Sequence, residues 1–266
     1  PVQIVGVQKE MPSGGWIRQS WVALREDLRA GFMKLTWQQW QALRALQSQI
    51  TYAVAVGDIY ALYLAYRYLA RPIVFVPTAK SDHIRSHLFI EKHLMRKHCE
   101  LVLPRDELTA ANLRQSGVPA KYVGNLMMDS IFPSGESLPG ISPDDTVVGI
   151  LPGSREEAYI NIPLLSIVVD AVISERPDIC FAMALAGNLS LDKVAAILMQ
   201  QGWQEVSRGS YGGEKERLLT KGPTRLLIAQ GRFGDILEVS RLCLGMAGTA
   251  NEQAAGLGRP VVAFPG

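Results

Sequence analysis

Short apolar runs alternate with segments of helical apolar spacing along most of the chain. The runs are rich in Val, Ile and Leu and end at Gly, Pro or Asp, which is typical of strands buried in a sheet. The segments between them place apolar residues three and four positions apart, as helices that cover a sheet do. This alternation predicts an α/β fold with parallel sheets and right-handed crossovers in both halves. The expected strands are residues 2–7, 52–56, 73–77, 101–103, 147–151, 179–185, 225–229, 242–246 and 260–264, and the expected helices are residues 17–32, 36–46, 59–69, 105–115, 156–176, 191–200 and 233–240.

Two stretches lack either periodicity and separate the regular parts. Residues 134–145 are rich in Pro, Gly, Ser and acidic side chains, so we expect a linker between a domain at 1–133 and a domain at 146–266. Residues 209–222 are glycine-rich and charged, and we expect a loop there. The chain begins inside an expected strand without an initiator Met and stops directly after another. We therefore expect a fragment in which the first domain lacks its start and the second lacks its end.

Composition narrows the classes of partner. The chain has 266 residues, of which 48% are hydrophobic, and a formal net charge of +2. That charge is too small to favour nucleic acid as a partner. No apolar stretch has the length of a membrane span, and the three cysteines lack metal-binding spacing, so we expect a cytoplasmic protein with reduced, buried thiols.

All four histidines fall in one basic segment, residues 83–98. His83 and His87 have the i,i+4 spacing of a metal pair, but no acidic or thiol side chain is obviously placed to complete a site. A solvated basic helix is the alternative, and we expect no metal site. The cations of this segment, or the Trp-rich helix near Trp37, are candidates for peripheral contact with a membrane; the aromatic side chains are equally compatible with a core.

The candidate chemistry lies where strands end in glycine turns. Gly153, Ser154 and Arg155 follow strand 147–151 and open a helix, which would aim backbone N–H groups and a cation at one spot that suits a diphosphate. Gly248 and Thr249 follow strand 242–246 in the same way. The alternative for such short patterns is an ordinary strand-to-helix turn.

Asp58 is the corresponding candidate in the first half. It follows strand 52–56 at the end where ligands of parallel sheets bind, so it is a candidate general base, with the N-cap of the next helix as its alternative role. Near the start, Gly14 and Gly15 would let a ligand approach the backbone or form a surface turn.

These motifs together resemble the lipid-A-disaccharide synthase family of GT-B glycosyltransferases. The resemblance is specific at Leu151-Pro152-Gly153-Ser154-Arg155 and at Gly248-Thr249-Ala250, and weaker elsewhere, including Val123-Gly124-Asn125. It covers nearly the whole chain and is greatest for a divergent, synthase-related branch in cyanobacteria. It implies a GT-B-like fold of two Rossmann-like domains that face each other across a cleft.

The resemblance also implies a reaction, its partners and its residues. The reaction is transfer of an acylated glucosamine, or a related sugar, from a UDP donor to a lipid-linked sugar acceptor, with inversion and without a metal or other cofactor. By similarity Asp58 is the base, and Ser13, Gly14 and Asn125 are acceptor-side residues. The donor-binding candidates are Gly153, Ser154, Arg155, Gly248, Thr249 and either Glu252 or Gln253 at the ribose.

The departures from the family pattern fall on the acceptor side. Ala61 and Tyr63 stand where the family has a second acid and an amide, and residues 77–82 replace its Ser-Pro-Ser and paired tryptophans. Two other functions therefore stay open. One is a UDP-sugar epimerase of similar fold, and the other is a non-catalytic protein that binds a nucleotide sugar or a lipid.

Overall fold

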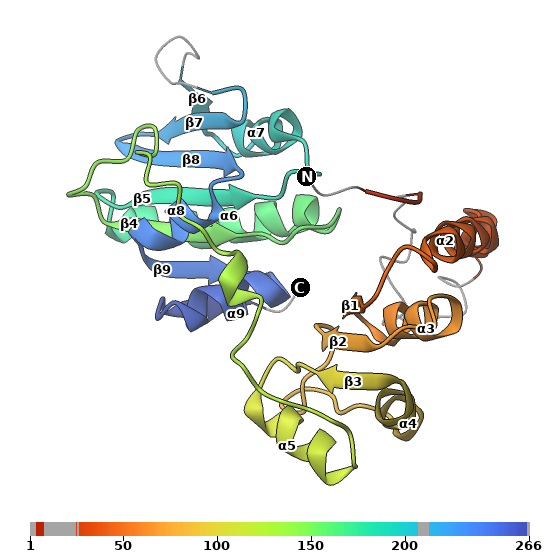
Figure 1. Ribbon diagram of the computed structural model, residues 1–266. Helices are drawn as coiled ribbons and strands as arrows, with labels where there is room; N and C mark the ends of the chain where they lie inside the picture. The colour runs from red at the N-terminus through yellow and green to blue at the C-terminus, as the bar shows by residue number, and fades with distance from the viewer. Residues whose placement is uncertain (1–3, 8–24, 26, 207–212, 265–266) are drawn as a thin grey trace. The chain divides into compact units, whose positions relative to one another are not determined.

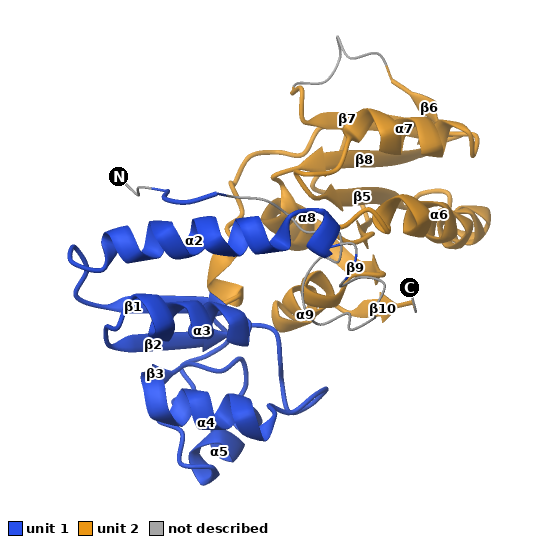
Figure 2. Cartoon of the chain, turned by 90° about the vertical axis from the view of Figure 1, so that its right-hand side faces the viewer, with its two compact units in different colours: residues 1–126 blue, residues 127–266 orange. Residues whose placement is uncertain are grey.

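The computed structural model describes residues 4–7, 25, 27–206 and 213–264. The chain divides into two compact units, Pro1–Leu126 and Met127–Gly266 (Figure 2). The expected linker, residues 134–145, lies within the second unit. Ser134 N donates to Asp235 Oδ1 at 2.6 Å, and Arg225 Nη2 pairs with Asp145 Oδ1 at 2.8 Å. This segment is therefore bonded to the second unit along its length.

The first unit contains a three-stranded parallel sheet in the order β1-β2-β3 (Figure 1). Its core lies between the sheet and the helices that follow β1 and β2, where Leu62, Phe75, Met95 and Val102 are fully buried. The elements are α2 (Phe32–Leu46), β1 (Ala53–Gly57), α3 (Ile59–Tyr68), β2 (Ile73–Pro77), α4 (Phe89–His98), β3 (Cys99–Val102) and α5 (Glu107–Gln115).

Three expectations for this unit need correction or fall outside it. The expected helix 36–46 begins earlier than predicted, because α2 starts at Phe32 and the Thr36 hydroxyl donates to the Phe32 carbonyl inside the helix at 2.9 Å. Residues 4–7 form no strand, and residues 2–3 of that expected strand lie outside the described residues. Residues 25 and 27–29 of the expected helix 17–32 are helical, and residues 17–24 and 26 lie outside the described residues.

The second unit contains a seven-stranded sheet in the order β10-β9-β4-β5-β8-β7-β6. Five strands are parallel, as predicted, and the antiparallel strands β7 and β6 extend one edge. The expected loop is wrong for residues 216–221, which form β7; residues 207–212 lie outside the described residues. The elements are η1 (Met128–Ser130), β4 (Val147–Leu151), α6 (Ala158–Glu175), β5 (Cys180–Leu185), α7 (Leu191–Met199), β6 (Gln204–Glu205), β7 (Glu216–Lys221), β8 (Thr224–Gln230), α8 (Phe233–Val239), β9 (Ser240–Gly245), α9 (Gly248–Gly256) and β10 (Val261–Ala263).

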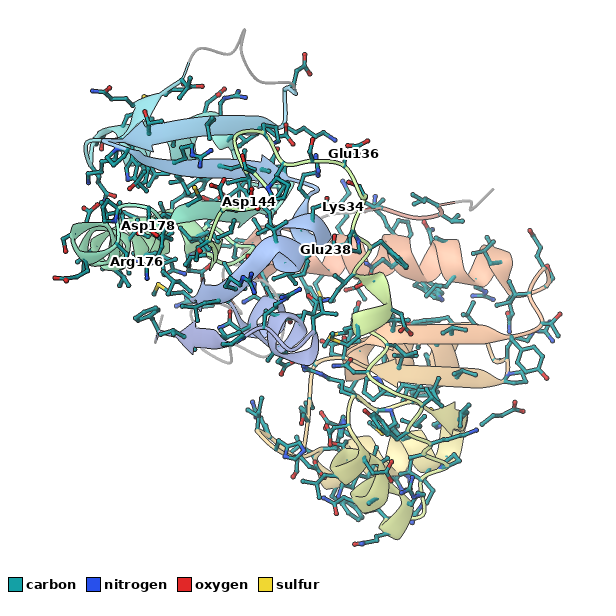
Figure 3. The ribbon with its side chains drawn as sticks, turned by 90° about the vertical axis from the view of Figure 1, so that its left-hand side faces the viewer. Lys34, Glu136, Asp144, Arg176, Asp178 and Glu238 are labelled. Carbon is teal, nitrogen blue, oxygen red and sulfur yellow. The ribbon has the colours of Figure 1, made fainter. Side chains whose placement is uncertain are left out.

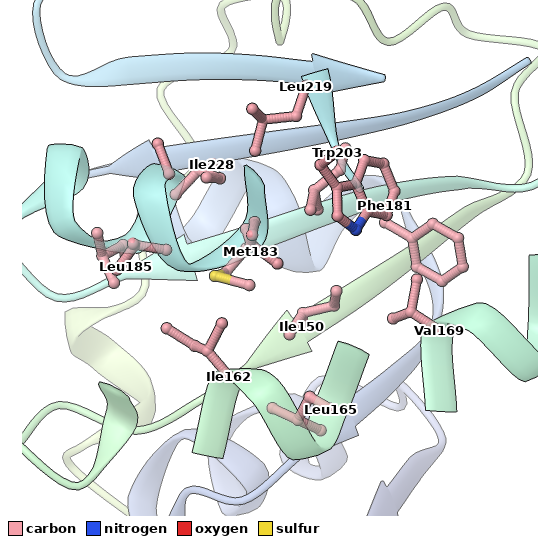
Figure 4. Packing of buried hydrophobic residues seen from close by; sticks show 14 of the residues in the cluster. Ile150, Ile162, Leu165, Val169, Phe181, Met183, Leu185, Trp203, Leu219 and Ile228 are labelled. Carbon is pink, nitrogen blue, oxygen red and sulfur yellow. The ribbon is translucent and has the colours of Figure 1, made fainter. Parts of the chain in front are cut away.

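Helices cover both faces of this sheet, and alternate residues of β4 point to each face. Val148 and Ile150 pack with α6 and α7 in the larger core cluster (Figure 4), whereas Val147 and Leu151 pack on the side of α8 and α9. Every residue of β4 is buried, which explains why its sequence is a continuous apolar run. Burial of a single large side chain such as Phe181 stabilises the fold by roughly 1.5–3 kcal/mol.

The helix α6 is long and apolar enough to cross a membrane by length and composition alone. Its inner residues Ile162, Leu165 and Val169 are buried in the core of the second unit, so it is a core helix of this fold. After its last turn, Arg176 and Asp178 form an exposed ion pair at 2.7 Å (Figure 3).

Candidate functional site

The two glycine turns of the second unit lie side by side at the carboxyl edge of its sheet. The chain leaves β4 through α6 toward β5, and it later returns to the opposite side of β4 as β9. Leu151 and Gly245, the last residues of the two strands, are register partners, and Met246 N donates to Leu151 O at 3.0 Å. The gap between β4 and β9 is thus the topological switch point of the sheet, the place where open α/β sheets bind ligands.

The turn after β4 is built for a fixed backbone and an exposed surface. Gly153 has a φ of 108°, which favours glycine over any other residue. The buried Asn161 amide of α6 donates to Pro152 O at 2.9 Å, and Asn188 donates to Ser154 O at 2.9 Å. Ser154 and Arg155 are exposed. Two amides thus hold the turn while its hydroxyl and guanidinium face the solvent.

The turn after β9 starts a helix directly. Ala247 is the N-cap of α9, and Gly248 and Thr249 in its first turn are exposed. The first backbone N–H groups of a helix have no partner within it, and they carry the positive end of the helix dipole. The side chain of Asn251 packs against Gly245, where a Cβ would overlap its amide, so this position requires glycine.

Glu252 and Gln253, the two alternatives for the ribose, have different surroundings. The Gln253 amide donates to Met127 O at 2.8 Å, which ties α9 to the segment that precedes η1. Glu252 is half-buried and lies one helical turn after Gly248. The Gln253 amide nitrogen is therefore engaged in a hydrogen bond within the second unit.

Asp58 lies at the carboxyl end of β1 in the first unit. Its side chain accepts from Tyr60 N at 3.0 Å as the N-cap of α3, so the expected capping role is confirmed. The same residue lines a cavity of about 80 Å³, so its position also suits the predicted base, a role that stays a prediction. The other residues that line the cavity are Gly57, Ile59, Phe75, Pro77, Ala79, Lys80, Arg85, His87, Leu88 and Glu91.

A buried polar cluster forms one side of this cavity. Glu91 in the first turn of α4 accepts from Lys80 Nζ at 2.7 Å and from Leu88 N at 2.9 Å, and His87 Nδ1 lies 3.3 Å from Glu91 Oε2. Burial alone would raise the pKa of Glu91, but the bonds to His87, Lys80 and the Leu88 N–H outweigh it and lower this pKa to about 2. Glu91 is therefore ionised at neutral pH.

The remaining candidates are placed apart from these groups or outside the described chain. Asn125 follows Gly124, which has a φ of 101°, and does not line the cavity. Ser13 and Gly14 lie outside the described residues, so their acceptor-side role stays a prediction. His83 is exposed beside Asp106 whereas His87 is buried beside Glu91, so the two histidines do not share a partner.

Metal and thiol chemistry find no support in the described part of the chain. No group of three or more His, Cys, Asp or Glu side chains in residues 4–7, 25, 27–206 and 213–264 is arranged to hold a metal ion. Cys99, Cys180 and Cys243 are buried and free, as expected, and burial raises the pKa of Cys99 to about 12.

The sequence pattern did not identify the side chains that hold these turns and the cavity together. Asn161 and Asn188 have no spacing that relates them to residues 152–154, because they come from α6 and from the loop after β5. Lys80 and Glu91 lie eleven positions apart, on either side of the irregular segment 81–88. A polar residue such as Asn161 on the apolar face of a predicted helix is the one signal that was present.

Comparison with known proteins supports the sequence resemblance. The chain is 30% identical over 203 residues to lipid-A-disaccharide synthase 2 of Legionella pneumophila strain Philadelphia 1, a match that covers 70% of this chain and 48% of that protein. It is 30% identical over 155 residues to lipid-A-disaccharide synthase of Azoarcus sp., covering 56% of this chain and 35% of that protein. The chain thus spans about a third to a half of the length of these relatives. No family model matches the chain.

Solved structures share the fold at low sequence identity. A UDP co-structure of Staphylococcus aureus MnaA has a TM-score of 0.58 and 16% identity, covering 86% of this chain and 61% of that chain. A UDP-GlcNAc 2-epimerase of Neisseria meningitidis, bound to UDP-GlcNAc, has a TM-score of 0.56 and 16% identity, covering 88% of this chain and 65% of that chain.

The doubly wound sheet, its two turns at the switch point and these structural matches define a protein of the GT-B-like fold class, as predicted. Within this class the sequence matches are more specific, because several synthases match at 25–30% identity. These matches support assignment of the chain to the lipid-A-disaccharide synthase family. Its assignment to a cyanobacterial branch stays a prediction.

Proposed function

We propose that the full-length protein is a glycosyltransferase that moves an acylated glucosamine, or a related sugar, from a UDP donor to a lipid-linked sugar acceptor. The observation that carries this proposal is the pairing of two glycine turns, with Ser154 and Arg155 on one of them, at the switch point between β4 and β9. The names of the synthase relatives supply the reaction class.

The second unit binds the donor. The backbone turn at Gly153 and the side chains of Ser154 and Arg155 hold the diphosphate, because a guanidinium and oriented N–H dipoles stabilise the charge of the departing UDP. Gly248 and Thr249 lie against the nucleotide. Glu252 or Gln253 binds the ribose. The UDP ligand named for the Staphylococcus aureus structure of the same fold supports UDP as the nucleotide.

The first unit binds the acceptor, and Asp58 takes the proton of its attacking hydroxyl. The reaction needs a base within hydrogen-bond reach of that hydroxyl, and Asp58 lines a cavity at the carboxyl edge of β1 and β2. Inversion follows if the hydroxyl attacks the sugar carbon on the face opposite UDP. We propose no metal ion in this step, because Arg155 and the helix N-termini supply the positive charge.

The protein works at the cytoplasmic face of a membrane. The start of α4 and the loop before it expose Ile84, Phe89 and Ile90, whose exposed fractions are 79%, 85% and 64%. The cation Arg85 is exposed in the same loop, and Arg96 is exposed in the last turn of α4. Exposed apolar side chains beside cations are typical of surfaces that enter the interface of an anionic bilayer. The helix near Trp37 stays the second candidate for this contact, because exposed Lys34 lies between exposed Met33 and Trp37 on α2.

The donor site is tested by UDP affinity. Arg155→Ala in the full-length protein should weaken UDP binding roughly 10- to 100-fold, because a charge-assisted contact with phosphate is worth about 1.5–3 kcal/mol. Arg176→Ala is the matched control, because Arg176 is an exposed arginine at the C-terminal end of α6, the helix that follows Arg155 (Figure 3). Equal UDP affinity of both variants and the parent protein would contradict the donor site.

The transferase reaction is tested by incubating the full-length protein with UDP-diacylglucosamine and a diacylglucosamine phosphate acceptor. Acceptor-dependent release of UDP is the expected result. A folded protein that releases no UDP with this or any other UDP-sugar would contradict the enzyme function.

A UDP-sugar epimerase is the second candidate, and the UDP-GlcNAc 2-epimerases among the structures of the same fold favour it. Analysis of the sugar after incubation without an acceptor separates the two, because only an epimerase changes the sugar alone. A non-catalytic binding protein would bind a UDP-sugar tightly, show no turnover, and keep its affinity in Asp58→Ala.

A further inference from the structure

The buried imidazole of His87 has one nitrogen in use and one without a partner. The side chain is 4% exposed, and its Nδ1 lies 3.3 Å from Glu91 Oε2. Among the described residues, no group bonds to its Nε2, which is closed off from bulk solvent. A buried polar atom without a partner is unfavourable and rare in native proteins, so it calls for a ligand or an ordered water.

The surroundings of Glu91 determine what this free nitrogen offers. The carboxylate of Glu91 is held ionised by Lys80 Nζ at 2.7 Å and by the Leu88 N–H at 2.9 Å. An ionised carboxylate only accepts hydrogen bonds, so His87 Nδ1 must carry the hydrogen in their contact. In the neutral ring, Nε2 is then a hydrogen-bond acceptor, and its complement is a donor such as a hydroxyl group.

The adjacent cavity is suited to such a group. His87 lines the cavity of about 80 Å³ that Asp58 also lines, and this volume holds several water-sized groups. Its wall includes Ile59, Phe75 and Pro77, whose apolar surfaces suit the C–H bonds of a sugar ring. Lys80 in the lining is paired with Glu91, so the cavity offers the His87 ring, the Asp58 carboxylate, the Arg85 guanidinium and an apolar wall. This combination suits the hydroxyl groups and C–H bonds of a sugar.

We propose that His87 binds a hydroxyl group of the acceptor sugar through Nε2, and that Glu91 is the positioning residue that fixes its ring. This inference rests on the proposed function for the identity of the sugar. It adds a hydroxyl-recognising residue next to the proposed base, so the site would distinguish an acceptor that carries this hydroxyl from its deoxy analogue.

A substitution can remove the free nitrogen and keep the contact with Glu91. In His87→Asn the amide nitrogen replaces Nδ1 as the donor to Glu91, and nothing replaces Nε2. His93→Asn is the matched control, because His93 is an exposed histidine on α4, the helix that begins just after His87. In the full-length protein we expect His87→Asn to raise the KM for a diacylglucosamine phosphate acceptor about tenfold, with UDP affinity and thermal midpoint close to those of the parent, and His93→Asn to change none of these.

A second measurement separates this inference from the proposed function. In protein labelled with ¹⁵N-histidine, the His87 signal, assigned by its loss in His87→Asn, should show a protonated Nδ1. Its Nε2 resonance should shift on addition of the diacylglucosamine phosphate probe and stay unchanged with UDP alone. An Nε2 resonance that ignores the probe, or an unchanged KM in His87→Asn, would overturn the inference even in an active transferase, and would leave bound water as the partner of His87. A shift without turnover would support the inference and contradict the transferase.

Discussion

The hydrogen bond from Asn161 to Pro152 connects the helix α6 to the backbone of the proposed phosphate turn. The Asn161 side chain is buried with an exposed fraction of 8%, and its Nδ2 donates to Pro152 O at 2.9 Å. In Asn161→Ala this carbonyl loses its partner at a place with little access to water. Loss of one neutral hydrogen bond together with a buried, unpaired carbonyl costs about 1–3 kcal/mol.

We expect this cost to appear as a lower thermal midpoint and a more mobile turn. For a transition of this size, 2 kcal/mol corresponds to roughly 4–8 °C. Because the protein has two units, a single free energy of unfolding is not defined, and the midpoint is best read together with hydrogen exchange of the amides of residues 153–155. Exchange of these amides should be faster in Asn161→Ala than in the parent protein.

Asn188→Ala is the control for this prediction. Asn188 donates to Ser154 O at the same 2.9 Å, but it is exposed, so water replaces the lost bond and the change should stay within about 0.5 kcal/mol. If Asn161→Ala lowers the thermal midpoint no more than Asn188→Ala does, burial of the Asn161–Pro152 hydrogen bond does not increase its contribution to stability, and the prediction is wrong.

Three further predictions follow from the described contacts. Gly245→Ala should lower the thermal midpoint because its Cβ overlaps Asn251, and adding Asn251→Ala should recover part of the loss. Gly187→Ala is the control, because a Cβ there meets nothing within 4 Å. An equal effect of both glycine variants would refute the overlap. The lowered pKa of Glu91 contributes stability that is fully present above its ordinary value of 4.5 and is lost as the pH falls toward about 2. The thermal midpoint should therefore fall less between pH 5 and 2.5 in Glu91→Gln than in the parent protein. An equal fall of the midpoint in both proteins would contradict this. Asp58→Asn and Asp58→Ala should both lower turnover about 100-fold or more. Only the alanine variant should lose about 1 kcal/mol of stability, because asparagine still caps α3. Full turnover in Asp58→Asn would exclude Asp58 as the base.

The buried strands were the most predictable part of the fold. The run 147–151 coincides with β4 because a strand covered on both faces is apolar throughout, and its Pro and Gly boundaries and β-branched residues favour a strand over a buried helix. The strand β7 was not predicted because only its Leu218 and Leu219 are strongly apolar, and its polar residues near the edge of the sheet resemble a loop. The start of α2 was predicted four residues too late, at residue 36 instead of 32. Threonine is a common N-cap, but Thr36 lies inside the helix and its hydroxyl bonds to the Phe32 carbonyl.

The candidate sites were also predictable only in part. The turns at Gly153 and Gly248 were predictable because each combines a strand end, a glycine and a helix start within a few residues. Their closeness in space was not, since it depends on β9 returning to the opposite side of β4. The cavity cluster of Lys80, His87 and Glu91 also depends on tertiary contacts, and the sequence showed only a basic segment with four histidines.

The antiparallel edge formed by β7 and β6 has a consequence for solubility. An unpaired strand edge is a template on which another chain can add a strand. The outermost strand β6 has only two residues, Gln204 and Glu205, both exposed, and it covers part of β7. A strand added at β6 would pair with only these two residues and would meet the Glu205 carboxylate, so this edge of the second unit's sheet disfavours self-association.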